Sequence, residues 1–247
     1  MDKIVCIMAA HGRSAITTET VRMLQKQTLP IEVLMVGDSV HEKKIADKTG
    51  CIYLEHQNKP LGKKWQAGVD YARTLTPDAV MICGSDSWLS PRWVEVATPH
   101  LYGHNDLVGI NTFYACKIYP NKKVQIIRRA YKDDRVGKPM GSGRIFSKSI
   151  LEQLNWCIFP VRKNVGMDSF SVRKIKKHEG IIKIVNLDDM KILAIKSTWD
   201  SISSWDSYLK AKNLKIFPDI KHPKVWLNQH FPGSVNALQR VVKNIKW

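Results

Sequence analysis

The sequence predicts an α/β fold, a Rossmann-like mixed sheet flanked by helices and followed by a basic C-terminal extension. Short apolar runs alternate with stretches of helical periodicity through the first hundred or so residues, as in sheets built from strand–helix–strand units. Polar residues follow several of the apolar runs directly, where strands of a parallel sheet would end. At 247 residues the chain is long enough to bury a sizeable core.

The first half of the chain alternates strands and helices. Continuous apolar runs predict buried strands, namely residues 3–10, 31–37, 51–54 and 78–84. The intervening stretches carry apolar residues on one helical face, namely residues 14–27, 41–49 and 63–75. Ser90 and Pro91 predict the start of a further helix, with serine as the N-cap and proline in the first turn.

The pattern changes after about residue 105. Strands are expected over residues 106–113, 124–130, 181–185 and 192–195, and helices over residues 169–179 and 235–246. The glycine-rich residues 137–143 predict a turn or loop. We expect residues 1–198 to form one domain and residues 199–247 to form the basic, tryptophan-containing extension.

Charge and cysteine usage narrow the class of protein. The chain has 39 Lys and Arg against 22 Asp and Glu, a net charge of +17. Such an excess favours a polyanionic partner, either nucleic acid, an anionic membrane surface or a phosphorylated ligand, although a lysine-rich solvated surface would give the same count. The five cysteines are odd in number and three lie in apolar runs, so reduced thiols in a cytoplasmic compartment are expected. No apolar run is long enough to span a membrane, and the first residues do not resemble a secretory signal.

Polar residues gather at the expected carboxyl ends of the strands. His11 and Arg13 follow the first, Asp38 the second and Asp86 the fourth. Ligands of open α/β sheets bind at this edge, so a nucleotide or another phosphate-bearing ligand is expected there. Asp38 and Asp86 are also common turn residues, and this structural interpretation stays open.

The order of the motifs resembles a nucleotide-sugar glycosyltransferase of the GT-A fold, close to family 2. The similarity covers roughly residues 3 to 196 and depends on order and spacing. It is carried by the first strand KIVCIMAAHGR, by VLMVGDS, by residues 58–62 (NKPLG), by GSDSWLSP and by Gly166-Met167-Asp168. By this resemblance residues 1–104 would bind the nucleotide sugar and residues 105–198 the acceptor.

The resemblance implies a role for each matching residue. Asp168 would be the catalytic base that takes a proton from the acceptor hydroxyl, and direct displacement would invert the anomeric carbon. Residues expected to contact the donor, a UDP-sugar by resemblance, are Ala9, His11, Arg13, Asp38, Lys63 or Lys64, Ser85, Asp86 and Lys196. Asp168 shares a helical face with Val172 and Ile175, so it is expected to point inward. It could instead serve only as the N-cap of its helix.

The chain departs from the family pattern at the residues that usually bind a metal ion. Gly84-Ser85-Asp86 stands where Asp-x-Asp is usual, so Asp86 is the single motif carboxylate left to hold Mg²⁺ or Mn²⁺. Lys196 stands where the resemblance places a metal-binding histidine, and its ammonium would neutralise the diphosphate in place of a metal. A metal-independent reaction is therefore an open alternative, as is a merely solvated Lys196.

Basic residues near the expected base suggest the acceptor. Those assigned to acceptor binding are Arg128, Arg129, Arg144, Arg162 and Lys163. Basic residues interleaved with aromatics suit nucleic acid, and the sharpest hypothesis is a phage or viral enzyme that glycosylates hydroxymethylated bases of DNA in the host cytoplasm. The alternatives are a membrane-associated glycan or lipid acceptor with peripheral membrane contact, a nucleotidyltransferase, and a non-catalytic nucleic-acid-binding module. No obligate protein partner is evident.

Overall fold

A seven-stranded mixed sheet forms the centre of the molecule. The computed structural model describes residues 3–132, 135–185, 190–197 and 214–247. The strand order is β10-β6-β9-β4-β1-β2-β3, and β4, β1, β2 and β3 run parallel. Strand β9 is antiparallel to both of its neighbours, β4 and β6. The strands are β1 (Ile4–Ala9), β2 (Glu32–Gly37), β3 (Ile52–Glu55), β4 (Ala79–Ile82), β6 (Leu107–Gly109), β9 (Arg144–Ser147) and β10 (Ile182–Ile184).

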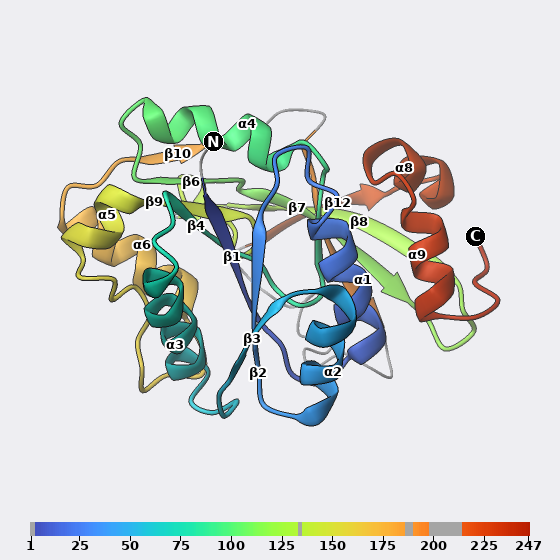
Figure 1. Cartoon of the computed structure of the whole chain (residues 1–247). Helices are drawn as coiled ribbons and strands as arrows, with labels where there is room; N and C mark the ends of the chain where they lie inside the picture. Colours follow the sequence, from blue (N-terminus) through green and yellow to red (C-terminus); the bar gives the residue numbers. More distant parts are fainter. Residues whose placement is uncertain (1–2, 133–134, 186–189, 198–213) are drawn as a thin grey trace.

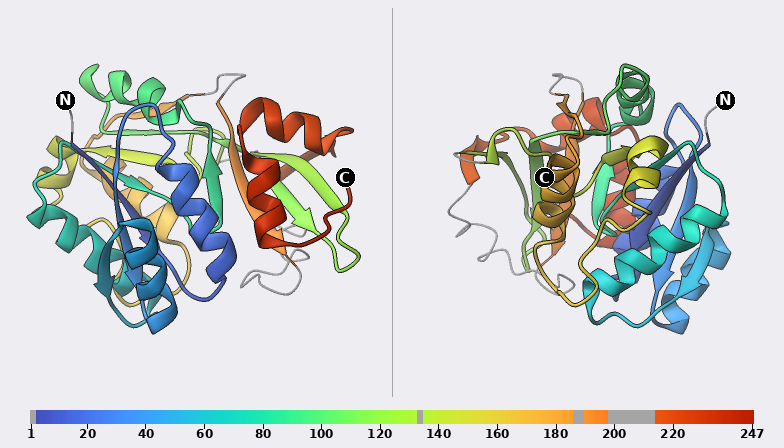
Figure 2. Two further views of the ribbon diagram at one scale, coloured as in Figure 1. Left: turned by 45° about the vertical axis from the view of Figure 1, so that its right-hand side comes forward. Right: turned by 90° about the vertical axis from the view of Figure 1, so that its left-hand side faces the viewer.

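Helices cover both faces of this sheet (Figures 1 and 2). On one face lie α1 (Ser14–Leu24), α2 (Val40–Thr49) and α4 (Trp93–Tyr102). On the other lie α3 (Leu61–Thr74), α5 (Lys148–Gln153) and α6 (Met167–Lys177). The predicted α/β architecture, with a mixed sheet between helices, is confirmed.

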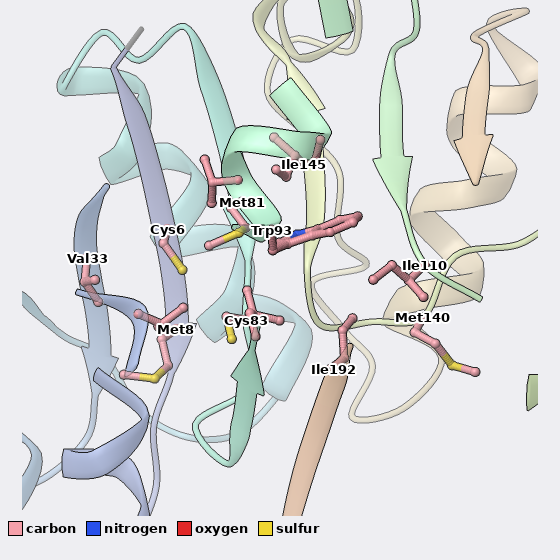
Figure 3. Close-up of a cluster of buried hydrophobic side chains, with 14 of the residues drawn as sticks. Cys6, Met8, Val33, Met81, Cys83, Trp93, Ile110, Met140, Ile145 and Ile192 are labelled. Atoms are coloured by element: carbon pink, nitrogen blue, oxygen red, sulfur yellow. The ribbon is translucent and has the colours of Figure 1, made fainter. Parts of the chain in front are cut away.

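Alternation along the strands divides the core between these two faces. In β1, Cys6 and Met8 face one helical layer while Val5 and Ile7 face the other, because successive side chains of a strand point to opposite sides. Figure 3 shows the first cluster, where Trp93 of α4 lies among residues of the sheet. The indole nitrogen of Trp93 donates to the Gly143 carbonyl at 2.9 Å. This bond ties α4 to the glycine-rich loop beside the candidate site.

A second, five-stranded sheet stands beside the first, in the order β12-β8-β7-β11-β5. Its strands are β5 (Ser87–Leu89), β7 (Thr112–Ile118), β8 (Val124–Tyr131), β11 (Ile192–Ser197) and β12 (Leu214–Asp219). The helices α8 (Pro223–His230) and α9 (Ser234–Val241) pack with it and with α1 around a third apolar cluster. Figure 2 shows both helices against this sheet.

The described part of the predicted C-terminal extension is thus built into the fold. Strand β12 pairs with β8, and α9 contacts α1. Arg240 of α9 donates to Glu19 of α1 through Nε at 2.8 Å and a terminal nitrogen at 2.7 Å. The predicted boundary at residue 198, and Trp199 and Trp205 of the predicted extension, lie outside the described residues.

Several predicted boundaries of the first half were wrong. Helix α1 ends at Leu24 rather than residue 27, because the buried Gln27 side chain bonds to the Ser90 carbonyl and the Val94 amide. Ser90 is not an N-cap: α4 begins at Trp93, and the Ser90 hydroxyl accepts from the Lys191 amide at 2.8 Å. Strand β5 (Ser87–Leu89), which sequence analysis did not predict, lies directly before Ser90.

Boundaries in the second half also differ. The expected strand over residues 106–113 is divided between the sheets, since the chain crosses from β6 to β7 near Asn111. Helix α6 begins two residues early, after Gly166, whose positive φ of 80° ends the preceding loop. Helix α9 ends at Val241 because Val242 is extended. Helix α8 and strands β9 and β12 were not predicted.

All five cysteines are free thiols, and burial raises the pKa of Cys116 to about 12. Within the described residues, no helix is long and apolar enough to cross a membrane.

Candidate active site

The loops after three adjacent parallel strands bring the expected donor residues to one edge of the sheet. Strand β1 lies between β4 and β2, so their carboxyl ends meet. Ala9 ends β1 and pairs with Val36 of β2, which places the β1 loop beside Asp38. These polar residues therefore lie along one edge of the sheet, as the sequence predicted.

Asp86 is the centre of a buried ion cluster. Its Oδ2 accepts from Arg13 at 2.6 Å and from the Lys196 ammonium at 2.5 Å, and its side chain is 9% exposed. Arg13 also donates to the Ser85 hydroxyl at 3.1 Å. Burial raises the pKa of Asp86, but the charges of Lys196 and Arg13 outweigh that effect and hold it below its usual 3.8. Asp86 is thus an ionised group inside a cationic cluster and not merely a turn residue.

The second sheet delivers Lys196 to this cluster. Strand β11 runs antiparallel to β5, and the Ile195 amide donates to the Asp86 carbonyl at 2.7 Å. Lys196 follows directly, with 5% of its surface exposed. The alternative of a solvated lysine is excluded by this burial.

A second polar cluster surrounds Asp38. Its carboxylate contacts His11 Nδ1 at 2.8 Å and the Lys64 ammonium at 3.3 Å. Lys64 is fully buried and also donates to the Ala10 carbonyl at 2.5 Å and to Asn58 at 3.3 Å. Burial lowers the pKa of Lys64 despite the Asp38 charge, and the pKa of Asp38 is lowered because His11 and Lys64 outweigh its burial. Lys63 is exposed, so of the two lysines offered by the sequence it is Lys64 that joins the cluster.

A cavity of about 410 Å³ opens between the two sheets and α6. Asp86 and Asp168, which are 82 positions apart in the chain, both line it. Aromatic side chains form much of the wall: Trp65, Phe113, Tyr131 and Phe159. A volume of this size accommodates a sugar ring together with part of an acceptor.

Asp168 lies in the first turn of α6, with its side chain 49% exposed. The N-cap is Gly166, so the alternative of Asp168 as an N-cap is wrong. Asp168 shares its helical face with the buried Val172 and Ile175, and at the N-terminal end this face meets the cavity rather than the apolar core. The helix dipole favours a carboxylate at this end.

Arg144 holds the start of α6 in place. It is 2% exposed and donates to the carbonyls of Pro139, Met140 and Asp168 and to the Ser171 hydroxyl. Its terminal nitrogen is 3.9 Å from the Asp168 carboxylate. The structure therefore places this predicted acceptor residue behind Asp168 rather than at the open side of the cavity.

The other predicted acceptor residues are scattered. Arg129 is fully buried, lines the cavity and lies 6.0 Å from the Phe113 ring centroid. Its neighbour Arg128 is exposed and stacks on Phe217 of β12 at 4.5 Å. Arg162 and Lys163 lie exposed in the loop before α6, outside the cavity lining.

Sequence analysis missed two contributors. Arg135 lines the cavity and donates to the Ser169 hydroxyl at 2.9 Å. Ser142 accepts from the Gly84 amide at 3.0 Å and donates to the Ser87 hydroxyl at 2.9 Å, so the glycine-rich loop braces the turn that carries Asp86. The glycine-rich pattern was noticed, but no spacing in the sequence connects it to residue 84.

The residues around Asp86 do not fit a divalent cation. Two cationic groups already occupy Oδ2 of the single motif carboxylate, and a metal ion at either oxygen would lie beside both of them. Within the described residues, no three His, Cys, Asp or Glu side chains are grouped closely enough to hold a metal ion.

An open α/β sheet with polar clusters at its strand ends and a cavity lined by two carboxylates is the arrangement expected of a nucleotide-sugar transferase. Comparison of the sequence with family models is consistent with this class: the model for glycosyl transferase family 2 matches residues 5–159. The chain therefore belongs to glycosyltransferase family 2. No curated protein sequence gives a significant match.

Solved structures resemble the fold at low sequence identity. TarS residues 1–349 from S. aureus align with a TM-score of 0.55 and 17% identity over 78% of this chain and 60% of that one. The same fragment in complex with UDP gives a TM-score of 0.54 and 15% identity, over 79% and 61% of the two chains. The chain thus spans about three fifths of these relatives' length, and the likeness is one of fold.

Proposed function

We propose that this protein transfers a sugar from a nucleoside-diphosphate sugar to a hydroxyl group of a polyanionic acceptor, with inversion at the anomeric carbon. One observation carries the proposal: Asp86 and Asp168 line a single cavity with room for a sugar. A donor diphosphate at Asp86 and an acceptor hydroxyl at Asp168 would place the reacting carbon between them. Uridine is the proposed base because the structurally similar TarS fragment binds UDP.

The two polar clusters divide the donor between them. Asp38, with His11 and Lys64, would bind the nucleoside, and the side chains around Asp86 would bind the ribose and diphosphate. Ala9 would contact the nucleoside through its backbone. Trp65 and Phe159, whose ring centroids are 5.7 Å apart, would form an apolar wall for the sugar.

The reaction needs one base and one stabilised leaving group. The acceptor oxygen forms a bond to the anomeric carbon while the bond from that carbon to the β-phosphate oxygen breaks. The hydroxyl proton passes to Asp168, and the electron pair of the broken bond remains on the diphosphate. A positioned carboxylate base contributes about 10²–10⁴-fold to such a step.

For the acceptor we propose DNA, specifically a hydroxymethylated base, modified in the cytoplasm. The net charge of +17 and the arginines that line the cavity, Arg129 and Arg135, support a polyanion. Phe113 and Tyr131, the other two aromatic side chains of the cavity wall, would stack on a base extruded from the duplex. DNA binding should weaken with salt at a log–log slope of about −5 for about six phosphate contacts.

A panel of nucleotide sugars, assayed for release of the nucleoside diphosphate, tests the transferase activity. Asp168→Asn should lower kcat by about 10²–10⁴-fold with unchanged thermal stability. The control Asp47→Asn, an exposed residue of α2, should leave kcat unchanged. Binding of nucleic acid without turnover of any donor would instead support a non-catalytic module.

Acceptor identity needs a separate experiment. Electrophoretic shifts with unmodified and hydroxymethylated duplexes, beside flotation with anionic liposomes, separate DNA from a membrane acceptor. Flotation without any shift of DNA would contradict the DNA proposal and leave the transferase proposal intact.

A further inference from the structure

We propose that Lys196 and Arg13 stabilise the diphosphate leaving group, in the position where a divalent metal ion would otherwise act. This inference rests on the proposed function, since it concerns the same donor site. Its basis is the buried arrangement of Arg13, Asp86 and Lys196, in which one carboxylate oxygen holds two cations.

The formal charges of Arg13, Asp86 and Lys196 together sum to one positive charge. Asp86 cancels one of its two partners and fixes the position of both, at 2.6 and 2.5 Å. All three side chains are largely buried, with exposed fractions of 12% for Arg13, 9% for Asp86 and 6% for Lys196. Cationic groups in a poorly solvated site attract an anion more strongly than they would in water.

Arg13 has donor capacity left for such an anion. Its Nε is buried and makes no hydrogen bond within the described residues. The residue itself has a left-handed backbone, with φ of 54°, and directly precedes α1. Uncommon backbone conformations of this kind are retained where surrounding contacts determine them, and here the contacts are those to Ser85 and Asp86.

The two cationic side chains at Asp86 also disfavour a metal ion there. Divalent cations bind carboxylate oxygens at about 2.0–2.6 Å. An ion at Asp86 Oδ2 would therefore lie beside both the Lys196 ammonium and the Arg13 guanidinium, and these like charges would repel it. In the proposed donor complex the Lys196 ammonium would face the oxygen on which negative charge develops when the glycosidic bond breaks, the role that a metal ion would otherwise have.

The first measurement is the affinity for UDP and for uridine, titrated separately in the presence of chelator. Wild-type protein should bind UDP with chelator present. Lys196→Met should weaken the affinity for UDP by about tenfold or more and leave the affinity for uridine unchanged. Lys196→Arg, which keeps the charge, should restore most of the UDP affinity. The control Lys183→Met, at an exposed position of β10, should match wild type for both ligands.

The second measurement is donor turnover with and without chelator, Mg²⁺ and Mn²⁺. Turnover by wild type should be the same with no addition, with chelator, with Mg²⁺ and with Mn²⁺. Lys196→Met should lower kcat by about 10²–10³-fold. Loss of turnover in chelator with recovery in Mg²⁺ or Mn²⁺, or an unchanged ratio of UDP to uridine affinity in Lys196→Met, would overturn the inference. Absence of UDP binding and donor turnover under every condition would instead refute the proposed function itself.

Discussion

The close approach of Gly141 to Asp168 allows the position of the proposed base to be tested without removing it. A Cβ atom added at Gly141 would lie 2.8 Å from both carboxylate oxygens of Asp168, whereas an ordinary contact begins at 3.4 Å. The Gly141→Ala variant must therefore displace the carboxylate by about 0.6 Å. Since a displacement of about 1 Å costs about 10²-fold in rate, we expect kcat to fall by about tenfold, or about 1.4 kcal/mol in activation free energy.

Stability should hardly change in this variant. The atoms that must yield are the end of a half-exposed side chain, and alanine also reduces the conformational entropy of the unfolded chain. Gly137→Ala is a matched control, because a Cβ there meets nothing within 4 Å and the site lies in the same glycine-rich stretch. The assay compares kcat, the UDP dissociation constant and the melting temperature of both variants with those of wild type.

Two outcomes would refute the reasoning. If Gly141→Ala retained wild-type kcat, the position of Asp168 would not control the reaction. If UDP affinity or the melting temperature fell while kcat for bound donor stayed constant, Gly141 would serve the fold or the donor site rather than the base.

Three further variants test other parts of the structure. Glu19→Gln weakens the contact with Arg240 and should cost about 2 kcal/mol of unfolding free energy at pH 7. Burial raises the pKa of Glu19, but its arginine partners lower it more, to below 4.5, so the stability advantage of wild type over the variant should be lost as the pH falls below about 4.5. If urea denaturation gave the same difference in unfolding free energy at pH 7 and at pH 3, the assignment would be contradicted. Gly62→Ala should lower the melting temperature by about 4–8 °C, because its Cβ would lie 2.0 Å from a backbone carbonyl oxygen; an unchanged scanning-calorimetry profile would show that the loop adapts. Lys64→Met should weaken uridine binding by about tenfold while Lys63→Met, at the exposed neighbour, should not; equal titration curves for the two variants would remove Lys64 from the donor site.

The strand ends of the first half could be predicted from the sequence because their pattern is local. Apolar runs followed directly by Asp38 or Asp86 mark strand ends, and parallel pairing brings neighbouring ends together. The carboxyl edge of the first sheet therefore followed from short stretches of sequence. The outcome is a correct α/β class and a correct location for the polar clusters.

The second sheet could not be predicted in the same way. The sheet and the helices packed with it make contacts between distant segments: Lys196 of β11 meets Asp86 across 110 positions, and Arg240 of α9 meets Glu19 of α1 across 221. Sequence analysis assigned Arg129 to acceptor binding and did not assign Arg135, because their places depend on which face of β8 and which loop meet the cavity. Helix α8 and strand β12 were missed because pairing and packing with distant elements define them.

One feature of the ion cluster bears on how the protein is made. A single carboxylate joins segments from the beginning, the first half and the last third of the chain, at positions 13, 86 and 196. A chain still emerging from the ribosome before Lys196 is exposed lacks one of the three, so it has no complete proposed diphosphate site. Capture of the donor should thus begin only after Lys196 has left the ribosome, and the captured donor should then hold the two sheets together.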